Sequence, residues 1–168
     1  IYMSFYEYAL KHSVNYKFEH MEEKLNLWFD PVQLQKVIFN LLSNAFKYTK
    51  VKGNITVSIR KVKNEVEIRV EDDGVGISEE SIHKIFDRFY QVDGQSSEFT
   101  LGTGIGLAVS KGIVELHKGS IRVEREVGKG SAFIVTLLMG NEHFPKDMLS
   151  DNESNFHLIK DEISEGLS

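Results

Sequence analysis

The sequence predicts an α/β domain, because segments with the residue pattern of strands alternate with segments that have the pattern of helices. Apolar residues three and four positions apart predict helices from residue 31 to about 48–52 and from 107 to 116. The chain has 168 residues, 41% of them hydrophobic, which is enough for one domain with a single core. Alternating apolar and polar residues predict strands at 14–18, 25–29, 55–59, 66–70, 120–125 and 132–138. The strand at 66–70 is predicted to pair with the strand at 55–59 across a charged turn at 61–65.

The composition excludes several classes of protein. A formal net charge of −5 at pH 7 disfavours broad nucleic-acid binding, which requires a basic surface. The absence of cysteine excludes disulfides and thiolate metal sites, and no apolar run approaches the roughly 18 to 20 residues that span a bilayer. The chain begins with Ile rather than Met and shows no signal-peptide pattern, so we expect a piece of a longer protein.

The helix predicted from Pro31 has clear boundaries and a polar edge. Asp30 is a favourable N-cap residue, Pro31 suits the first helical position, and Gly53 is the expected terminator. Residues three and four apart share a face, and asparagine is unfavourable inside a helix because its side chain competes for the backbone. Amide oxygens suit Mg²⁺ and a lysine suits phosphate, so the edge indicates a metal–phosphate site, with a solvated polar edge as the alternative. The edge consists of Asn40, Asn44, Lys47 and Tyr48.

The segment Val70–Ser78 (VEDDGVGIS) places carboxylates and two glycines directly after a strand pattern. Gly74 and Gly76 allow positive φ angles and a close approach of the backbone to a flat or bulky ligand. A carboxylate at such a turn can accept a hydrogen bond from a ligand amine. We interpret the segment as a recognition element, and a plain strand followed by a glycine turn is the alternative.

The next segments combine a short helix with a stretch that has no periodicity. Ser78 is the predicted N-cap of a helix that runs into Ile85–Tyr90. In that helix, Phe86 and Phe89 are interpreted as core anchors. Residues 91–101 contain few apolar residues and are predicted to form a mobile loop of functional length.

The last third of the chain contains a glycine-rich helix start, a hairpin and a polar tail. The segment Gly102–Leu107 opens a helix whose free N–H groups and dipole favour an anion. It follows a loop and has the wrong glycine spacing for a dinucleotide fingerprint. Two strands meet at a turn over Gly128–Gly130, and residues beyond Gly140 form an acidic linker or tail.

Four segments in register carry a resemblance to a known family. Their order and spacing resemble the catalytic, ATP-binding domain of bacterial sensor histidine kinases, over about residues 15–140. The wider superfamily includes gyrase, the heat-shock chaperone ATPases and the mismatch-repair ATPases, and the Trp28-Phe29-Asp30 sequence is similar to that of large hybrid sensory kinases. The four segments are Asn40–Thr49 (NLLSNAFKYT), Asp72–Ile77 (DDGVGI), Ile85–Tyr90 (IFDRFY) and Gly102–Ala108 (GTGIGLA).

The resemblance implies a two-layer α/β sandwich, in which about three helices cover one face of a mixed five-stranded sheet, with a mobile ATP lid (the Bergerat fold). It divides the chain into the end of a helical linker (1–14), the ATP-binding catalytic domain (15–140) and a C-terminal linker or tail (141–168). It implies a protein histidine kinase of a two-component system, which binds Mg²⁺-ATP and transfers the γ-phosphate to a histidine on a separate dimerisation domain.

The resemblance also implies partners and a location. The partners are the helical dimerisation and phosphoacceptor domain of the same protein and a downstream response-regulator receiver domain. Nucleic acid and direct membrane contact are not expected. The domain is expected in the cytoplasm, as part of an inner-membrane-anchored sensor, and the isolated piece is expected to be a monomer because dimerisation belongs to the helical domain.

The resemblance assigns roles to individual residues. Asp72 matches the aspartate that accepts a hydrogen bond from the adenine amine, and Asn44 matches the Mg²⁺ ligand. Asn40 lies beside it to assist the metal or the phosphates, and Lys47 matches the phosphate-contacting lysine; these three form the implied catalytic set. Phe86 and Phe89 match the block that anchors the lid. Further ATP-contacting residues implied are Tyr48, Gly74, Gly76, Ile77, Phe89, Gly102, Thr103, Gly104, Ile105, Gly106 and Leu107.

Two features depart from the family pattern. Gln91 stands where family members often have a basic residue that reaches the terminal phosphate, and residues 91–101 contain neither Lys nor Arg. A phosphoacceptor histidine is usually followed by an acidic residue, and none of the six histidines of this chain is. The phosphoacceptor is therefore expected on another domain.

Three alternatives stay open. A hydrolytic ATPase of the gyrase class has a glutamate that activates water where this chain has Asn40, which favours the kinase. A serine kinase of the anti-sigma type shares most of the four segments. The third alternative is a degenerate module that binds nucleotide, or nothing, and works by interaction alone; the loop without basic residues favours it.

Overall fold

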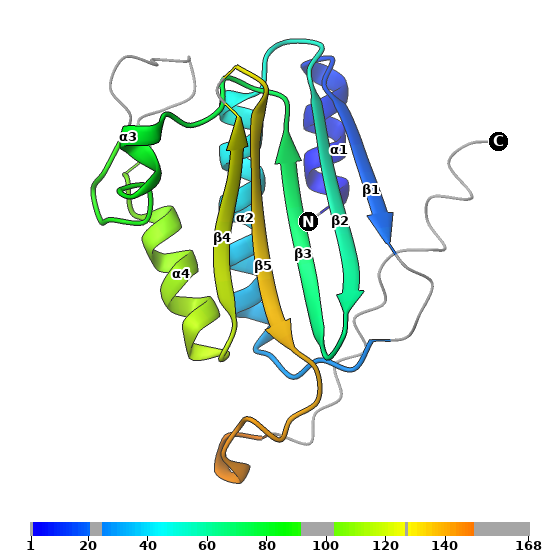
Figure 1. Ribbon diagram of the computed structural model, residues 1–168. Helices are drawn as coiled ribbons and strands as arrows, with labels where there is room; N and C mark the ends of the chain where they lie inside the picture. The colour runs from blue at the N-terminus through cyan, green and yellow to red at the C-terminus, as the bar shows by residue number, and fades with distance from the viewer. Residues whose placement is uncertain (1, 21–24, 92–102, 127, 150–168) are drawn as a thin grey trace, which may run out of the picture.

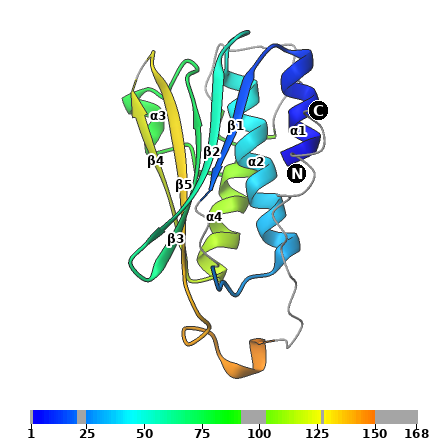
Figure 2. The same cartoon turned by 90° about the vertical axis from the view of Figure 1, so that its right-hand side faces the viewer.

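A computed structural model describes residues 2–20, 25–91, 103–126 and 128–149. In these ranges, five strands form one mixed sheet, and α1, α2 and α4 cover one of its faces (Figures 1 and 2). The two-layer α/β sandwich expected from the sequence is thereby confirmed. The elements are α1 (Tyr2–Lys11), β1 (Asn15–His20), α2 (Pro31–Tyr48), β2 (Asn54–Val62), β3 (Glu65–Asp72), α3 (Glu79–Ile82), α4 (Gly106–Leu116), β4 (Ser120–Glu126), β5 (Gly130–Leu138) and a 3₁₀ helix (Lys146–Met148).

The strand order across the sheet is β1-β2-β3-β5-β4. Strands β1 and β2 are parallel, as the intervening helix α2 requires, and the other neighbours are antiparallel. The hairpins β2–β3 and β4–β5 were both predicted from the sequence. Because β5 lies between β3 and β4, the start of β5 is next to the end of β3, with Asp72 opposite Ser131.

The core lies between the sheet and helices α2 and α4. Strand β3 alternates between buried residues on the helix-covered face and more accessible ones on the open face, as its sequence pattern predicted. Helix α2 presents apolar residues three and four positions apart to this face, and Leu41 is fully buried. Residues fully buried in this core include Val37, Leu42, Ile55, Val66, Val70, Val114 and Val135.

Helix α2 begins where the sequence predicted. The Asp30 carboxylate accepts hydrogen bonds from the N–H groups of Val32 and Gln33, at 2.8 and 3.1 Å, and Pro31 is the first helical residue. His117, at the end of α4, accepts a hydrogen bond from the Asp30 N–H at 2.9 Å. The end of α4 therefore holds the start of α2.

Two local predictions were wrong. Residues 25–29 alternate like a strand, but among the described residues Leu27 forms isolated bridges to Met139 and Gly140 and no ladder. The helix capped by Ser78 ends at Ile82, and turns follow it. The Ser78 side chain caps it as expected, accepting a hydrogen bond from the Ser81 N–H.

Helix α1 packs against α2 through aromatic side chains. The Phe5 ring stacks on Phe46 at 5.3 Å between centroids and contacts Phe39 at 5.4 Å. Tyr8 meets Phe46 edge to face, also at 5.3 Å.

The division of the chain at residue 14 stays a prediction. Within the described ranges, no helix is long and apolar enough to cross a membrane.

Candidate nucleotide site

Asp72 ends strand β3 and is 5% exposed. Its Oδ1 accepts a hydrogen bond from the Gly74 N–H at 2.9 Å, and its Oδ2 accepts one from the Ser131 hydroxyl at 2.7 Å. Burial raises the pKa of Asp72, while the hydrogen bonds from Ser131 and Gly74 oppose that shift. Among the described residues Asp72 forms no ion pair, so it is a buried acceptor with its orientation fixed by neutral donors.

Ser131 was not singled out from the sequence. It begins β5 directly after the Gly128–Gly130 turn, and it is 9% exposed. The turn was predicted from the sequence. The Ser131 hydroxyl is relevant only because β5 pairs with β3 in a register that sets Ser131 opposite Asp72. A short hydroxyl residue at the start of that strand is the signal that could have identified it.

Gly74 allows the end of α2 to lie against the turn that follows β3. A Cβ atom on Gly74 would stand 2.3 Å from the Tyr48 carbonyl oxygen and 2.8 Å from the Asp72 carboxylate. Any other residue would push these two segments apart. The sequence predicted a close backbone approach here, and the structure shows that the approaching group is the backbone of α2.

Asn40 joins helix α2 to the first turn of α4. Its Nδ2 donates to the Gly106 carbonyl oxygen at 3.1 Å and to the Ser110 hydroxyl oxygen at 3.2 Å. Ser110 is fully buried and donates to the same Gly106 oxygen at 2.9 Å. The amide nitrogen of Asn40 therefore holds α2 against the first turn of α4. The role of Asn40 toward metal or phosphate stays a prediction.

The other residues of the α2 edge are half-buried, as Asn40 is. The half-buried Asn44 side chain forms no hydrogen bond to any described residue, so its amide is available for a ligand. The Lys47 ammonium lies over the Tyr48 ring, 5.2 Å from its centroid. The Thr49 hydroxyl is buried and has no partner within the described part of the chain, which is costly unless water or a ligand pairs with it.

Backbone contacts join the two ends of the segment between Phe89 and Gly104. The Phe89 N–H donates to the Gly104 carbonyl oxygen at 2.9 Å, and both residues have positive φ angles, 65° and 67°. A Cβ atom on Gly104 would lie 2.8 Å from the Phe89 backbone, so glycine is required at this contact. The predicted loop and lid, with Gly102, lie outside the described residues.

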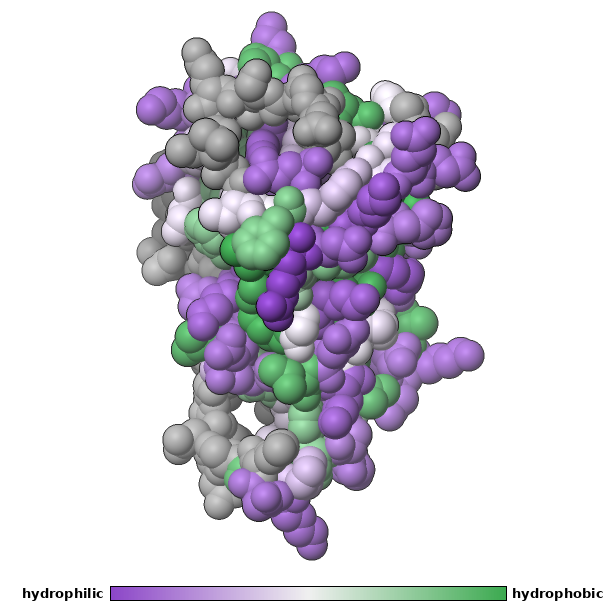
Figure 3. Space-filling model, turned by 90° about the vertical axis from the view of Figure 1, so that its left-hand side faces the viewer, coloured by the Kyte–Doolittle hydropathy of each residue, from purple (hydrophilic) through white to green (hydrophobic). Residues whose placement is uncertain are grey.

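Phe86 and Phe89 differ, so the interpretation of both as core anchors is wrong for one of them. Phe86 packs edge to face on Phe133, at 6.4 Å between centroids. Phe89 is 72% exposed, because its positive φ turns the side chain away from the core. On the side of the molecule that carries α3 and α4, apolar surface interrupts the hydrophilic surface (Figure 3).

The start of α4 faces the polar edge of α2 through the contact between Gly106 and Asn40. Ile105, at the N-cap position, has no polar side chain with which to cap the helix. The first N–H groups of α4 therefore lack a side-chain cap and suit an anion. Thr103 is exposed, and Leu107 packs partly against the core.

Helix α2 thus links three predicted segments: the end of β3 and the end of α2 lie at the top of Figure 1, and α4 begins lower, beside the middle of α2. The turn after β3 contacts the end of α2 through Gly74 and Tyr48, and the α2 edge contacts α4 through Asn40 and Gly106. Gly76 has a φ of 72°, as the sequence predicted, and Ile77 packs partly against the core.

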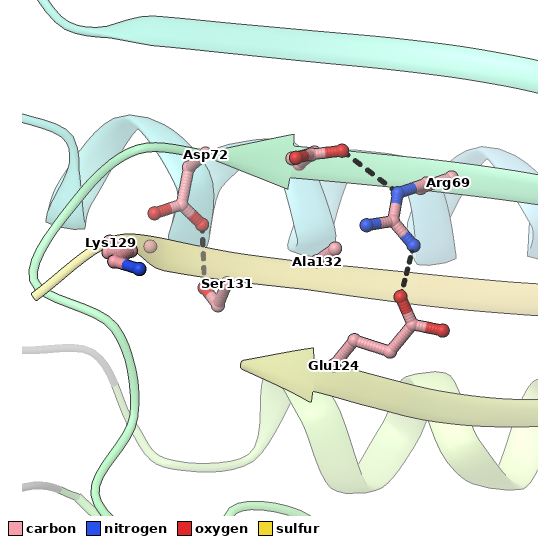
Figure 4. A pocket seen from close by; sticks show the side chains of 8 residues that line it. Arg69, Asp72, Glu124, Lys129, Ser131 and Ala132 are labelled. Atoms are coloured by element: carbon pink, nitrogen blue, oxygen red, sulfur yellow. Dashed lines mark hydrogen bonds and ion pairs between the residues drawn. The ribbon is translucent and has the colours of Figure 1, made fainter. Parts of the chain in front are cut away.

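A hollow of about 230 Å³ opens near the Gly130 turn, and Asp72 and Ser131 are among the residues that line it (Figure 4). Three of its other lining residues neutralise one another: Arg69 pairs with Glu71 at 2.9 Å and with Glu124 at 2.6 Å. It is smaller than an ordinary ligand pocket of about 300 to 1,000 Å³. Because Arg69, Glu71 and Glu124 are already paired with one another, we assign none of these three side chains to nucleotide binding; Asp72 is the residue of the candidate site that also borders this hollow.

The donor set at the α2 edge is compatible with Mg²⁺ but not with a metal held by the protein alone. No cluster of three or more His, Cys, Asp or Glu side chains that could hold a metal occurs in the described ranges. Mg²⁺ binds few protein ligands and completes its shell with water and phosphate oxygens. An amide without other partners, such as that of Asn44, fits this chemistry.

With this geometry in place, comparison with known proteins identifies the family. The chain belongs to the histidine kinase-, DNA gyrase B-, and HSP90-like ATPase family, whose model matches residues 29–141. The recognition from the four sequence segments is thereby confirmed.

The relatives within this family are a histidine kinase and a sensor protein. The chain is 41% identical over 170 residues to Histidine kinase P4 of Formosa agariphila, which covers 98% of this chain and 12% of the relative. It is 39% identical over 115 residues to the sensor protein SrrB of Staphylococcus aureus, covering 68% of this chain and 20% of the relative. The chain therefore spans between an eighth and a fifth of these relatives.

The fold is similar to that of a solved kinase domain. The catalytic domain of histidine kinase ThkA, in a nucleotide-free form, aligns with a TM-score of 0.72 at 29% identity, covering 82% of this chain and 88% of that one. ThkA has also been solved in complex with the response regulator protein TrrA, with a TM-score of 0.70 at 27% identity over 85% of this chain and 39% of that one. The expected enzyme class is therefore that of the relatives, histidine kinases.

Proposed function

We propose that this chain is the catalytic domain of a histidine kinase, and that it binds Mg²⁺-ATP and presents the γ-phosphate to a histidine on a separate phosphoacceptor domain. The family and the histidine kinases among its relatives support the proposal. The observation that carries it is that the polar edge of α2 links a buried acceptor, Asp72, at the end of β3 to the start of α4.

Asp72 supplies adenine recognition in this proposal. Its two carboxylate oxygens each accept one hydrogen bond from the protein and retain lone pairs for a further donor. An exocyclic amine can supply that donor, whereas a carbonyl at the same place would be repelled. Adenine therefore fits better than guanine or a pyrimidine with a carbonyl at this position.

The α2 edge and the start of α4 form the phosphate end of the proposed site. Asn44 would hold Mg²⁺, with Asn40 beside it, and Lys47 would contact phosphate. The bound metal would neutralise phosphate charge. The first N–H groups of α4 have no side-chain cap and begin beside Asn40, so they favour anionic oxygens near this edge. These groups position the triphosphate, which is most of what phosphoryl transfer requires from a protein.

The position of Asn40 favours transfer over hydrolysis. Its amide cannot accept a proton from water at neutral pH, and its nitrogen already donates to Gly106 and Ser110. An imidazole nucleophile requires no strong base from this domain. The proposed reaction therefore forms a bond between phosphorus and a partner's imidazole nitrogen, and ADP leaves.

The relatives also support proposed partners and a location. A response-regulator receiver domain is proposed as the downstream partner, because the similar kinase ThkA forms a complex with the response regulator TrrA. A sensor protein among the relatives supports a role in signalling. We place the domain in the cytoplasm as one part of a longer, membrane-anchored sensor; this follows from the resemblance and from the short share of each relative that the chain spans.

Calorimetry with a non-hydrolysable ATP analogue tests the proposal. We expect a dissociation constant between about 1 μM and 1 mM in the presence of Mg²⁺, a range of about −8 to −4 kcal/mol. A radiolabelled γ-phosphate should then pass to a supplied helical domain with a phosphoacceptor histidine, and the product should be acid-labile. An acid-stable product would indicate a serine kinase, and steady ATP turnover without a partner would indicate a hydrolytic ATPase.

A second candidate rests on residues 91–101, which contain neither Lys nor Arg. A domain without this basic contact to the terminal phosphate would act as a nucleotide-binding or interaction module without transfer. Binding of the analogue without phosphoryl transfer to any supplied histidine domain would favour this module. Absence of binding with and without Mg²⁺ would contradict the kinase and favour a module that works by interaction alone.

A further inference from the structure

We infer that Asp73 is a positioning residue of the nucleotide site: its carboxylate holds the turn between α2 and β2 against the end of β3. In this way it fixes the position of the α2 edge relative to Asp72. The inference rests on the proposed function, because it concerns how the adenine end and the phosphate end of one site are kept in register.

Asp73 and Asn54 share three hydrogen bonds. The Asp73 Oδ1 accepts from the Asn54 backbone N–H at 2.8 Å, and its Oδ2 accepts from the Asn54 side-chain Nδ2 at 2.6 Å. The Asp73 N–H donates to the Asn54 carbonyl oxygen at 3.2 Å. The carboxylate therefore grips both the backbone and the side chain of the first residue of β2.

The contact extends to the start of β1. The Asn54 Oδ1 accepts from the Asn15 Nδ2 at 2.8 Å, and the Asn15 N–H donates to the Gly53 carbonyl oxygen at 2.8 Å. Three segments that are far apart in the sequence thus meet at Asp73. We call Asn15, Asn54 and Asp73 the polar clamp.

Two glycines show how closely the clamp draws α2 to β3. A Cβ atom on Gly53 would lie 2.6 Å from the Asp73 carboxylate and 2.8 Å from the Lys50 carbonyl oxygen. A Cβ atom on Gly74 would lie 2.3 Å from the Tyr48 carbonyl oxygen. These contacts leave no room for a side chain, and the Asp73 carboxylate supplies directional attraction beside them.

The position of Asp73 makes this attraction relevant to the ligand. Asp73 is the residue after Asp72, whereas Asn54 lies at the first strand position after α2. Since α2 is a rigid helix, fixing its end also fixes Asn44 and Lys47 within its last two turns. A ligand that binds at both ends gains affinity only if the two half-sites keep the spacing that it spans.

The negative charge of Asp73 is unfavourable beside Asp72, so we expect the Asp73 carboxylate to have a specific role there. Its carboxylate lies beside the buried Asp72, and their repulsion adds to the burial that raises the pKa of Asp72. A neutral residue would avoid this repulsion. The two hydrogen bonds to Asn54 explain why a carboxylate is nevertheless useful at an exposed position.

The test compares two ligands on Asp73→Ala and Asn54→Ala. We expect the affinity for a non-hydrolysable ATP analogue, measured by calorimetry with Mg²⁺, to fall about 5- to 20-fold in Asp73→Ala. Adenosine, which lacks the phosphates, should bind within about 2-fold of wild type in an NMR titration. Asn54→Ala should lose affinity for the analogue to a lesser degree, since its backbone N–H remains.

Two further variants separate positioning from folding. Glu71→Ala is the matched control, because Glu71 lies on the same strand and faces the open side, where it pairs with Arg69; it should bind both ligands like wild type. Asp73→Asn keeps an oxygen acceptor for the Asn54 N–H and should restore at least half of the lost binding free energy. Thermal unfolding of each variant shows that the titrations are made on folded protein.

Three outcomes would overturn the inference. Unchanged binding of the analogue to Asp73→Ala would mean that the clamp does not position the site. Equal loss of adenosine and analogue would mean that Asp73 acts on the adenine end alone. Wild-type protein that binds no nucleotide would overturn the proposed function and this inference with it, whereas failure in the variants alone leaves the proposed function intact.

Discussion

The two faces of the sheet place carboxylates in opposite environments. On the helix-covered face, Asp72 is buried, accepts hydrogen bonds from neutral donors, and has a pKa raised by burial. On the open face, Glu71 and Glu124 are about half exposed and both pair with Arg69 (Figure 4). The hydrogen bond from Arg69 lowers the pKa of Glu124. A carboxylate beside a cation is already satisfied, whereas one without a cation is available to a ligand.

The open face is nevertheless not a plain polar surface. Ile134 is 1% exposed there and Ala132 is 3% exposed, although none of the described helices covers them. Arg69 pairs with Ile134 in the sheet register, and Arg122 is its neighbour on the other side. The aliphatic parts of arginine side chains can cover apolar residues while their charged groups stay in water.

The largest expected effect tests whether the two faces are packed alike. Leu41 lies on the buried face of α2. Leu41→Ala should lower the free energy of unfolding by about 2 to 5 kcal/mol, because its rigid neighbours cannot fill the cavity that the smaller side chain leaves. Ile134→Ala should cost less, since flexible arginine side chains can move into the space. Urea unfolding of both variants measures the difference, and equal losses would contradict the distinction between the two faces.

The next effect concerns Asp72 as a ligand group. Asp72→Asn should lower the affinity for the ATP analogue by about 10- to 100-fold, since a hydrogen bond to a charged group contributes about 1.5 to 3 kcal/mol. At neutral pH the same variant should be at least as stable as wild type, because it removes a buried charge. Binding equal to that of wild type in calorimetry would remove Asp72 from the site.

The pH dependence of wild type relative to Asp72→Asn sharpens this point. Because the pKa of Asp72 is raised above the ordinary value of 3.8, the folded protein takes up this proton before the unfolded chain as the pH falls. The stability of wild type relative to the variant should be greatest below pH 3.8 and decrease as the pH rises through the raised pKa. Adenosine affinity should show the opposite trend, as a protonated carboxyl accepts poorly. Urea unfolding and NMR titration across this range test both signs.

A smaller effect is expected at the phosphate end. Asn44→Ala should abolish the gain in analogue affinity that Mg²⁺ gives wild type, a coupling on the order of 10-fold. Affinity without Mg²⁺ should change little, because Asn44 makes no hydrogen bond to a described residue. Calorimetry with and without Mg²⁺ measures the coupling. A variant that keeps the full Mg²⁺ dependence would move the metal ligand elsewhere.

The smallest effect is expected on the open face. Glu124→Gln removes one partner of Arg69, and an exposed ion pair contributes about 0.2 to 1 kcal/mol. Its contribution is present above the ordinary pKa of 4.5 and is lost as the pH falls through the lowered pKa. Nucleotide affinity should not change. A loss above that range in urea unfolding would show that this face contributes more than surface pairs usually do.

The sequence predicted those features that local chemistry determines. The Asp30 cap, the α2 face and both hairpins follow from capping and periodicity, and all were found. Residues 25–29 had the right alternation but no partner strand among the described residues to complete a ladder, and alternation alone does not show whether a partner exists.

The features that escaped prediction depend on contacts between distant segments. Ser131 matters because of the β3–β5 register, and Asp73 because α2 ends beside it. The exposure of Phe89 follows from its contact with Gly104, fifteen positions later. Asn40 was correctly expected on the polar edge of α2, but its bonds to α4 could not be read from spacing within one helix.

The hydrogen bond from the Phe89 N–H to the Gly104 oxygen has a consequence for how such domains diversify. Since the two ends of the intervening stretch are held at its base, the rest of the fold does not depend on how many residues lie between them. Doubling a flexible loop costs only about 0.6 kcal/mol of closure entropy. A change in the number of residues between Phe89 and Gly104 should therefore leave the sheet and its core unchanged.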